Sequence, residues 1–398
     1  MDTREIDPHD DMFWNDVRTQ FPLLNDRIYF NTSTMGISPH SVLDAVKVHM
    51  YELEKTGDSG HSMPLWQDVK DRVARLLNCS GDEIALTRNT TEGSNIVCNG
   101  LPLEAGDEII TSSHEHAGNT MTWLARQKRD QLVIKVFEPS TDDGETLERI
   151  EALRTPRTRV LSVPHVSCAS GQVLPLTAIG QLAAQHEIYY FVDGAQALGC
   201  VDVDLQAIGC HAYATSAHKW MLGPNGTGFL FVRQDALDLI QAQHVGAYSN
   251  AGAFSMETGE ISFVSTAQRY EYGTVNASLV VGIQAALQFI EDIGPHNILR
   301  HNQALADAFE QGLRTLGAEV LTSAHGAARS SIVSFRLPDV PYQALQSYLW
   351  DKHHLRLRGI YEGGLDALRA SLHLYNSFME VEKALEGITA AKKMGIKT

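Results

Sequence analysis

Tyr213-Ala-Thr-Ser-Ala-His-Lys-Trp-Met-Leu-Gly-Pro-Asn-Gly-Thr-Gly-Phe-Leu-Phe-Val232 is the part of the chain from which we interpret the rest. It predicts two buried strands, His211–Thr215 and Thr227–Val232, joined by a loop that carries Lys219. A lysine is costly to bury, and a low-dielectric site lowers its pKa and makes it a nucleophile toward aldehydes. On this stretch alone, the simpler interpretation is a strand-end lysine that reaches solvent.

A second apolar strand, Tyr189-Tyr-Phe-Val-Asp-Gly-Ala-Gln-Ala-Leu-Gly199, ends in Asp193 and a glycine turn. Lys219 and Asp193 together fit a site for pyridoxal 5'-phosphate (PLP). The cofactor needs a lysine for its aldehyde and an acid that keeps its ring nitrogen protonated. The second stretch therefore favours a catalytic role for Lys219.

Asp193-Gly-Ala-Gln196 and Ser216-Ala-His-Lys219 resemble the signature of the fold-type I PLP-dependent enzymes, specifically the class V aminotransferase family. Within that family the chain looks most like the branch of isopenicillin N epimerases, cysteine desulfurases and related carbon–sulfur lyases. The resemblance covers about Tyr29 to Leu385. It implies an α/β fold, with a mostly parallel seven-stranded sheet sandwiched by helices in a large domain, and a small α+β C-terminal domain.

Length and composition are consistent with a two-domain enzyme. The chain has 398 residues, which is longer than a single hydrophobic core usually supports. It is 43% hydrophobic and 20% charged. Its net charge of −16 argues against nucleic acid or an anionic membrane as partner. Five cysteines without paired spacing predict neither disulfides nor a metal site, and they favour a reducing, cytoplasmic compartment. The acidic N-terminus predicts no signal peptide, and no apolar run is long enough to span a membrane.

We expect three segments along the chain. Residues 1–27 form an arm that packs with the small domain, residues 28–294 form the PLP-binding domain, and residues 295–398 form the small domain. The junction is placed at Gly294-Pro295, where a helix is expected to end. Before it, the pattern predicts a helix from Val232 to about Gln243 and a Gly/Ser/Ala-rich loop over Gly246–Gly259.

The segment Arg88-Asn-Thr-Thr-Glu-Gly-Ser-Asn95 follows a predicted strand into a helix. Hydroxyls and unpaired backbone N–H groups at a helix start form a phosphate site, although a simple helix cap has a similar sequence. The resemblance implies that the cofactor phosphate is held by four residues: Thr90, Thr91, Ser216 and His218.

The resemblance also assigns residues around the cofactor ring. It places His116 over the ring, where a flat imidazole holds the cofactor and can move protons. It gives Gln196 a bond to the ring oxygen. Cys168 stands where much of the family has a small polar residue, often asparagine. It is either a buried small hydrophobe or a proton donor or sulfur handler near the reacting carbon. His114 and His116 lack a third metal ligand nearby, so we expect no metal.

For the substrate, Arg369 in the run Arg-Ala-Ser-Leu-His-Leu-Tyr-Asn376 matches the family arginine that clamps the α-carboxylate. A strand is expected over His354–Arg358. Arg356 or Arg358 on this strand is expected to add a second contact, and we assign that contact to Arg358. The turn Asn31–Gly36 lies at the mouth of the site in the family, so Asn31 is a candidate substrate contact. Alternatively, the turn is a plain connection to a helix capped by Ser38.

The segment Arg269-Tyr-Glu-Tyr-Gly-Thr274 matches a family motif whose threonine reaches the phosphate of the neighbouring subunit. This implies a homodimer with shared active sites. The alternative is that Thr274 caps the following helix, and both roles are compatible.

The resemblance implies chemistry at the α-carbon of an L-amino acid, with Lys219, His116 and Asp193 as the catalytic groups. Three outcomes compete: a β-elimination, an isopenicillin N epimerase-like inversion, and an aminotransferase reaction. Cysteine desulfurase itself is disfavoured, because the loop from Arg358 to Arg369 contains no nucleophilic cysteine. Cys168 favours β-elimination, that is, a carbon–sulfur lyase acting on an S-substituted cysteine. A non-catalytic regulator is disfavoured, since no basic DNA-binding segment is present.

Overall fold

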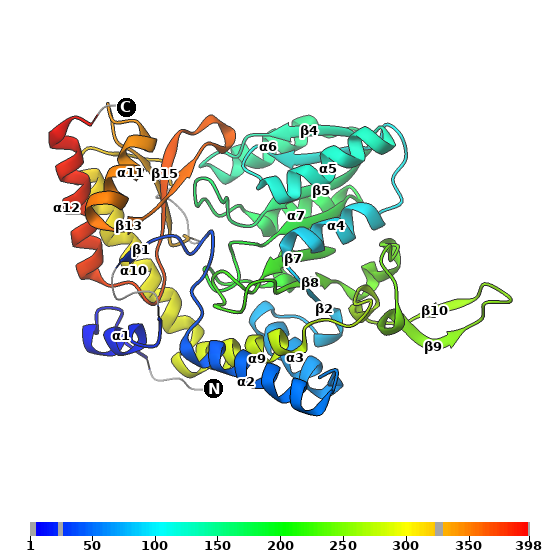
Figure 1. Cartoon of the computed structure of the whole chain (residues 1–398). Helices are drawn as coiled ribbons and strands as arrows, with labels where there is room; N and C mark the ends of the chain where they lie inside the picture. Colours follow the sequence, from blue (N-terminus) through cyan, green and yellow to red (C-terminus); the bar gives the residue numbers. More distant parts are fainter. Residues whose placement is uncertain (1–4, 23–26, 323–328, 397–398) are drawn as a thin grey trace.

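The computed structural model describes residues 5–22, 27–322 and 329–396, and its larger part is built on one wide sheet (Figure 1). The strands, in spatial order, are β2 (Ile84–Thr87), β8 (Gly228–Val232), β7 (Ala212–Ser216), β6 (Tyr189–Asp193), β5 (Thr158–Pro164), β3 (Glu108–Ser112) and β4 (Val133–Phe137). β8 alone runs in the direction opposite to the other six strands. The predicted mostly parallel seven-stranded sheet is confirmed.

Both faces of this sheet are covered by helices, and successive side chains along a strand point to opposite faces. Along β6, Tyr189 and Phe191 enter one apolar cluster, while Tyr190 and Val192 enter the other. One face is covered by α4 (Thr90–Gly100) and α5 (Ala117–Asp130), and the other by α3 (Met63–Leu77), α7 (Leu176–Gln185) and α9 (Ala277–Ile293). A parallel sheet needs helices on both faces, and its strands are therefore nearly continuous runs of apolar residues.

A second, smaller sheet is antiparallel throughout. Its strands, in spatial order, are β11 (Glu319–Val320), β12 (Ile332–Arg336), β15 (Ala367–Ser371) and β14 (Arg358–Ile360). One apolar cluster joins this sheet to α10 (Pro295–Thr315), α11 (Tyr342–His353) and α12 (Phe378–Met394). The three domain boundaries predicted from the sequence remain predictions.

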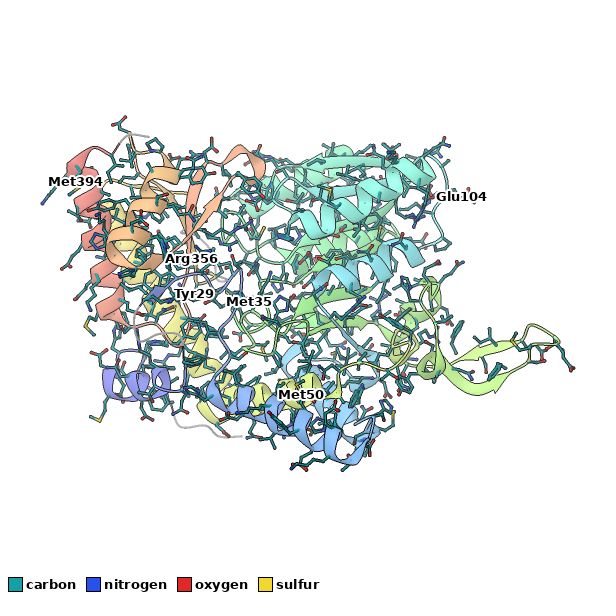
Figure 2. All side chains as sticks on the ribbon, viewed as in Figure 1. Tyr29, Met35, Met50, Glu104, Arg356 and Met394 are labelled. Carbon is teal, nitrogen blue, oxygen red and sulfur yellow. The ribbon has the colours of Figure 1, made fainter. Side chains whose placement is uncertain are left out.

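The N-terminal segment runs across both parts of the molecule. In α1 (Asp11–Arg18), the ring of Trp14 stacks on His301 with centroids 3.9 Å apart, and Arg18 forms a 2.6 Å ion pair with Glu380. Further on, β1 (Ile28–Tyr29) pairs in parallel with β13 (Leu355–Arg356). Figure 2 labels Tyr29, Met35 and Arg356 close together, left of the centre of the view, and the Tyr29 hydroxyl donates to the Met35 carbonyl at 2.8 Å.

Two predictions between β8 and α9 were wrong. The expected helix up to Gln243 is a short 3-10 turn, Gln234–Leu239. The expected loop over Gly246–Gly259 contains β9 (Asn250–Phe254), which pairs with β10 (Ile261–Phe263) in an arm that projects from the body (Figure 1). All three residues of β10 are exposed. Because a ribbon with no buried face shows no two-residue alternation, composition alone predicted a loop.

Three smaller expectations also change. The hydroxyl of Ser38 donates to the Gly223 carbonyl at 3.2 Å and does not cap α2 (His40–Thr56), which follows Pro39. Asn276, not Thr274, caps α9. The single strand expected over His354–Arg358 divides between two sheets, as β13 and β14.

Within the described ranges, no single helix is long and apolar enough to cross a membrane. By length and composition, α9 and α10 meet that test only as a pair bent by 77°.

Candidate active site

The predicted catalytic residues converge because they follow the carboxyl ends of neighbouring parallel strands. His116 comes after β3, Cys168 after β5, Asp193 ends β6, and Lys219 follows β7. In a parallel sheet these ends share one edge, where ligands of α/β proteins bind. Residues far apart in the sequence therefore face one site.

Lys219 is held by a tight loop against the turn that begins at Asn31. The amide of Gly36 donates to the His218 carbonyl at 2.9 Å, and a Cβ on Gly36 would lie only 1.9 Å from the Lys219 carbonyl oxygen. Burial lowers the pKa of the Lys219 amine to about 8, against the opposing charge of Asp193. A larger share of the amine is therefore neutral, and nucleophilic, near neutral pH than for an exposed lysine.

Asp193 supplies a buried negative charge beside this lysine. Its Oδ1 accepts from the Ala195 amide at 2.9 Å. Burial raises the pKa of Asp193, while the hydrogen bond from Ala195 and the charges of Lys219 and His116 oppose the rise. A buried carboxylate needs a cation or a proton close by, which fits a protonated ring nitrogen. Glu115 is its buried neighbour: burial, then the charge of Asp193, raises the Glu115 pKa well above its usual value.

Two hydroxyls meet at the start of α4. Thr90 and Ser216 lie 2.6 Å apart through their side-chain oxygens, and the Thr90 amide donates to Ser216 Oγ at 3.3 Å. Hydroxyls at the N-terminus of an eleven-residue helix suit a phosphate. The imidazole of His218 donates from Nδ1 to the Thr227 carbonyl at 3.1 Å, so Nε2 carries a proton only when the ring is charged. A phosphate dianion would favour that charged form.

The ring-binding candidates are also oriented by the protein. His116 Nδ1 accepts from the Gly118 amide at 3.0 Å, and burial followed by the charge of Lys219 lowers the His116 pKa. The neutral ring therefore carries its proton on Nε2. Gln196 donates to the Ser33 carbonyl and accepts from the Trp220 indole, each at 2.9 Å. One of its amide N–H groups is left for the cofactor.

Thr91 is placed beside His116 rather than beside Ser216. A Cβ added to Gly118 would lie 2.4 Å from Thr91 Oγ1 and 3.0 Å from His116 Nδ1. The glycine therefore lets the start of α4 approach the His116 turn closely. Whether Thr91 reaches the phosphate stays a prediction.

Arg369 is completely buried and points its donors at the site. It donates from Nη1 to the Cys168 carbonyl at 2.6 Å and from Nη2 to Thr34 Oγ1 at 3.0 Å. Its Nε has no hydrogen-bond partner in the described part of the chain. Burial raises the pKa of the Cys168 thiol to about 11, although the charges of Arg369 and Lys219 oppose this. The thiol is therefore protonated at neutral pH.

The structure separates the two candidate arginines. Arg358 forms an ion pair with Glu362, and its charge acts on Lys219 and His116. Arg356 instead lies over the ring of Trp350, 5.7 Å from its centroid. Arg358 is thus the one that faces the site. The side chain of Asn31 is buried and accepts from Thr34 at 2.8 Å, so its link to Arg369 is indirect.

Thr274 lies outside this cluster. Its side chain is exposed, in the short segment just before α9. His61 stacks on Tyr248 with ring centroids 4.2 Å apart. Sequence reasoning missed Thr34 and Glu362. The turn and the loop that carry them were recognised, but no motif distinguishes the two residues.

Comparison with known proteins agrees with this geometry. The family model "Aminotransferase class-V" matches residues 28–384. A cysteine desulfurase of Klebsiella pneumoniae is 30% identical, covering 95% of this chain and 98% of its own, and a probable cysteine desulfurase of Methanothermobacter thermautotrophicus is 29% identical, covering 96% and 98%.

Two solved structures are also similar, and one of them carries the cofactor. A mutant of C-DES with glycine covalently linked to its PLP cofactor aligns with a TM-score of 0.85 at 27% identity, covering 94% of this chain and 98% of its own. The cystine C-S lyase C-DES in complex with cysteine persulfide aligns with a TM-score of 0.84 at 26% identity, covering 93% and 99%. The site residues fit PLP, since the buried carboxylate of Asp193, the hydroxyl pair at α4 and the amine of Lys219 match its ring nitrogen, phosphate and aldehyde. The chain belongs to the class V aminotransferase family of fold-type I enzymes and is a PLP-dependent enzyme.

Proposed function

We propose that this enzyme removes the sulfur substituent of an S-substituted L-cysteine by β-elimination, as a carbon–sulfur lyase. The proposal rests above all on the state of the Cys168 thiol, which lies near Lys219. Cys168 is protonated, with a pKa of about 11, and the loop from Arg358 to Arg369 contains no cysteine. Since a thiolate is the nucleophile in sulfur transfer, a site without one leaves elimination as the favoured route.

The roles of the residues follow from their environments. Arg369 would pair with the α-carboxylate through its unoccupied donors, which orients the α-hydrogen toward Lys219. Bound PLP withdraws electrons from the α-carbon and so acidifies this hydrogen. The amine of Lys219 takes the proton, because its lowered pKa suits a general base near neutral pH. Asp193 holds a negative charge at the ring nitrogen, and His116 presents its flat ring.

The reaction balances without an oxidant or a reductant. The α-proton passes to Lys219, the bond between Cβ and sulfur breaks, and its electron pair leaves with sulfur, which then takes a proton. One water hydrolyses the remaining three-carbon unit to pyruvate and ammonium. Cys168 lies near enough for its charge state to respond to Lys219 and Arg369, and its protonated thiol is available as the donor to the leaving sulfur.

We further propose a homodimer in which Thr274 reaches the phosphate of the neighbouring site. Exposed apolar side chains on α2, among them Leu43, Met50 and Tyr51, flank a cavity of about 990 Å³ that also contacts Met35. Contiguous apolar surface of this kind is typical of an interface. Light scattering of the purified protein tests the dimer, and Thr274→Ala tests its role through a weaker affinity for PLP. The cytoplasmic location stays a prediction.

The decisive experiment uses the holoenzyme in heavy water with several S-substituted L-cysteines and one long-chain L-amino acid, followed by proton NMR. Pyruvate with ammonium supports the lyase. Accumulation of a D-isomer without pyruvate would establish an epimerase, which the named relatives do not support. In a parallel sample with a 2-oxo acid added as amino-group acceptor, formation of a new 2-oxo acid without loss of sulfur would establish an aminotransferase.

A further inference from the structure

The backbone on either side of Lys219 is held by hydrogen bonds from other parts of the chain. Before it, the His218 carbonyl accepts from the Gly36 amide at 2.9 Å. After it, the Trp220 carbonyl accepts from Nε2 of His373 at 2.9 Å. The first of these bonds comes from backbone, whereas the second depends on one side chain. The position of the lysine backbone therefore depends on an imidazole that the reaction scheme above does not use.

His373 is completely buried and lies two residues after β15. Because a carbonyl oxygen only accepts, its Nε2 carries a proton. Its Nδ1 lies 2.9 Å from Nδ2 of Asn302 on α10, and an amide nitrogen only donates. Burial lowers the pKa of His373 to about 3, although the hydrogen bond to Trp220 opposes this. The ring is therefore neutral near neutral pH, and both of its nitrogens are occupied.

Trp220 extends this constraint to the candidate ring-binding residue. Its indole donates from Nε1 to Oε1 of Gln196 at 2.9 Å. An indole N–H only donates, so the amide oxygen of Gln196 must face Trp220. The amide nitrogen gives one hydrogen to the Ser33 carbonyl at 2.9 Å. Its second hydrogen remains for another acceptor, which the sequence predicts to be the ring oxygen of the cofactor.

Three contacts in series thus lead from α10 to the cofactor site: Asn302 with His373, His373 with Trp220, and Trp220 with Gln196. All four side chains are at most 3% exposed. The rings of His373 and Trp220 also pack edge to face, with centroids 5.3 Å apart. A buried polar group that loses its partner cannot turn to water instead, so the orientation of each side chain depends on the one before it.

The segments that hold the lysine also hold the substrate arginine. Arg369 lies on β15, four residues before His373. It donates to Thr34 at 3.0 Å, and Thr34 lies in the same turn as Gly36. Both hydrogen bonds to the neighbours of Lys219 therefore come from segments that carry or contact Arg369. They set the distance between the amine and the carboxylate site.

We propose that His373 is a positioning residue which, through the carbonyl and the indole of Trp220, fixes the backbone of Lys219 and the amide of Gln196 relative to the cofactor. It acts only through Trp220 and takes no part in bond breaking. The proposal concerns the placement of PLP, so it does not depend on which reaction follows. It goes beyond the lyase function in assigning a role to a residue outside the site.

The test measures two properties of the resting protein, its affinity for PLP by equilibrium dialysis and the visible absorption maximum of the PLP-loaded form. Neither needs turnover. We expect His373→Leu to weaken PLP binding by about tenfold and to shift the absorption maximum, because the Gln196 amide is no longer held. His373→Gln should restore both properties, since its amide can donate to the Trp220 carbonyl and accept from Asn302.

His301→Leu is the matched control. His301 is another buried histidine, 1% exposed, and burial lowers its pKa to about 4. Its two nitrogens lie 2.7 Å from the Pro8 carbonyl and 3.2 Å from the Asn376 carbonyl, outside the loop that carries Lys219. We expect His301→Leu and His373→Leu to lose similar stability in chemical denaturation. Only His373→Leu should change PLP affinity and absorption.

A double-mutant cycle separates a route through Trp220 from a general loosening of the core. Trp220→Phe removes the indole donor and keeps the backbone carbonyl, so it should reproduce the shift of the absorption maximum. Added to Trp220→Phe, His373→Leu should cause no further shift, because the Gln196 amide is already released.

Wild-type affinity and absorption in His373→Leu would overturn the proposal, as would an equal change in His301→Leu or additive shifts in the double variant. If His373→Leu does not fold, Asn302→Ala decides, because it removes only the donor to Nδ1. It should show a weaker form of the same shift, and an unchanged spectrum would overturn the proposal. The lyase function is tested separately, by pyruvate formation with the wild-type enzyme.

Discussion

Gly36→Ala would place a methyl group where the backbone of the lysine loop already lies. The new Cβ would be 1.9 Å from the Lys219 carbonyl oxygen, 2.8 Å from the Lys219 carbonyl carbon and 3.2 Å from the His218 carbonyl oxygen. These are backbone atoms of a loop closed by the hydrogen bond from the Leu222 amide to the Lys219 carbonyl at 3.2 Å. The methyl group therefore cannot be accommodated by rotation of a side chain.

The cost has a structural and a kinetic part. To reach an ordinary contact, the distance must grow from 1.9 Å to at least 3.4 Å, so the turn that begins at Asn31 must move by roughly 1.5 Å. Overpacking of this kind costs about 1–3 kcal/mol of stability. The same movement strains the 2.9 Å hydrogen bond from the Gly36 amide to His218. It also shifts Thr34, which holds Arg369, and a displacement of about 1 Å can cost about 100-fold in rate.

The assay is chemical denaturation together with kcat/KM on an S-substituted cysteine. Gly144→Ala is the matched control, because its new methyl meets no backbone atom and only one side-chain atom, Asp142 Oδ1, at 3.1 Å. We expect the control to keep wild-type stability and rate, and Gly36→Ala to lose both. A Gly36→Ala enzyme with wild-type kcat/KM would refute the coupling between the turn and the arginine, whatever its stability.

Three other predictions use the charges of the site. In the cofactor-free protein, the Lys219 pKa of about 8 lies below its ordinary value of 10.5, so the unfolded chain binds more protons than the folded protein between these two values. The contribution of Lys219 to stability should therefore rise with pH in this window and be lost as the pH falls through 8. Lys219→Met should abolish this part of the pH dependence in a series of melting curves. Arg369→Lys should lower kcat/KM by about 100-fold or more, because an ammonium cannot form two parallel hydrogen bonds with a carboxylate; unchanged kinetics would remove this residue from the substrate site. Thr90→Ala and Ser216→Ala should each weaken PLP affinity by roughly tenfold, measured by equilibrium dialysis, and a variant with wild-type affinity would place the phosphate elsewhere.

Much of the site could be predicted because its chemistry is carried by residue types that are costly elsewhere. A lysine and an aspartate at the ends of apolar strands are unusual enough to define a cofactor site together. The fold followed from the same strands, whose continuous apolar runs require cover on both faces. The choice between Arg356 and Arg358 had no such signal, since both lie in a short polar-apolar alternation and only the division into β13 and β14 separates them.

The exposed elements were predicted least well. The β9–β10 arm has no buried face, and the segment after β8 is too short for helical periodicity, so each was assigned from composition and each was wrong. Caps were misassigned for a related reason: Ser38 and Thr274 are good capping residues by type, yet their neighbours Pro39 and Asn276 occupy the cap positions.

The amino-acid sequence by itself determined which strands are buried, and it identified Lys219, Asp193 and Arg369 as the candidates for cofactor and substrate binding. Only the tertiary structure decided that Thr34 holds Arg369, that Glu362 neutralises Arg358, and that these two arginines face each other. The physical reason is the separation along the sequence of the residues involved. Burial and periodicity are local properties of a strand or helix, whereas Thr34 and Arg369 become partners only when segments 335 residues apart meet at one sheet edge.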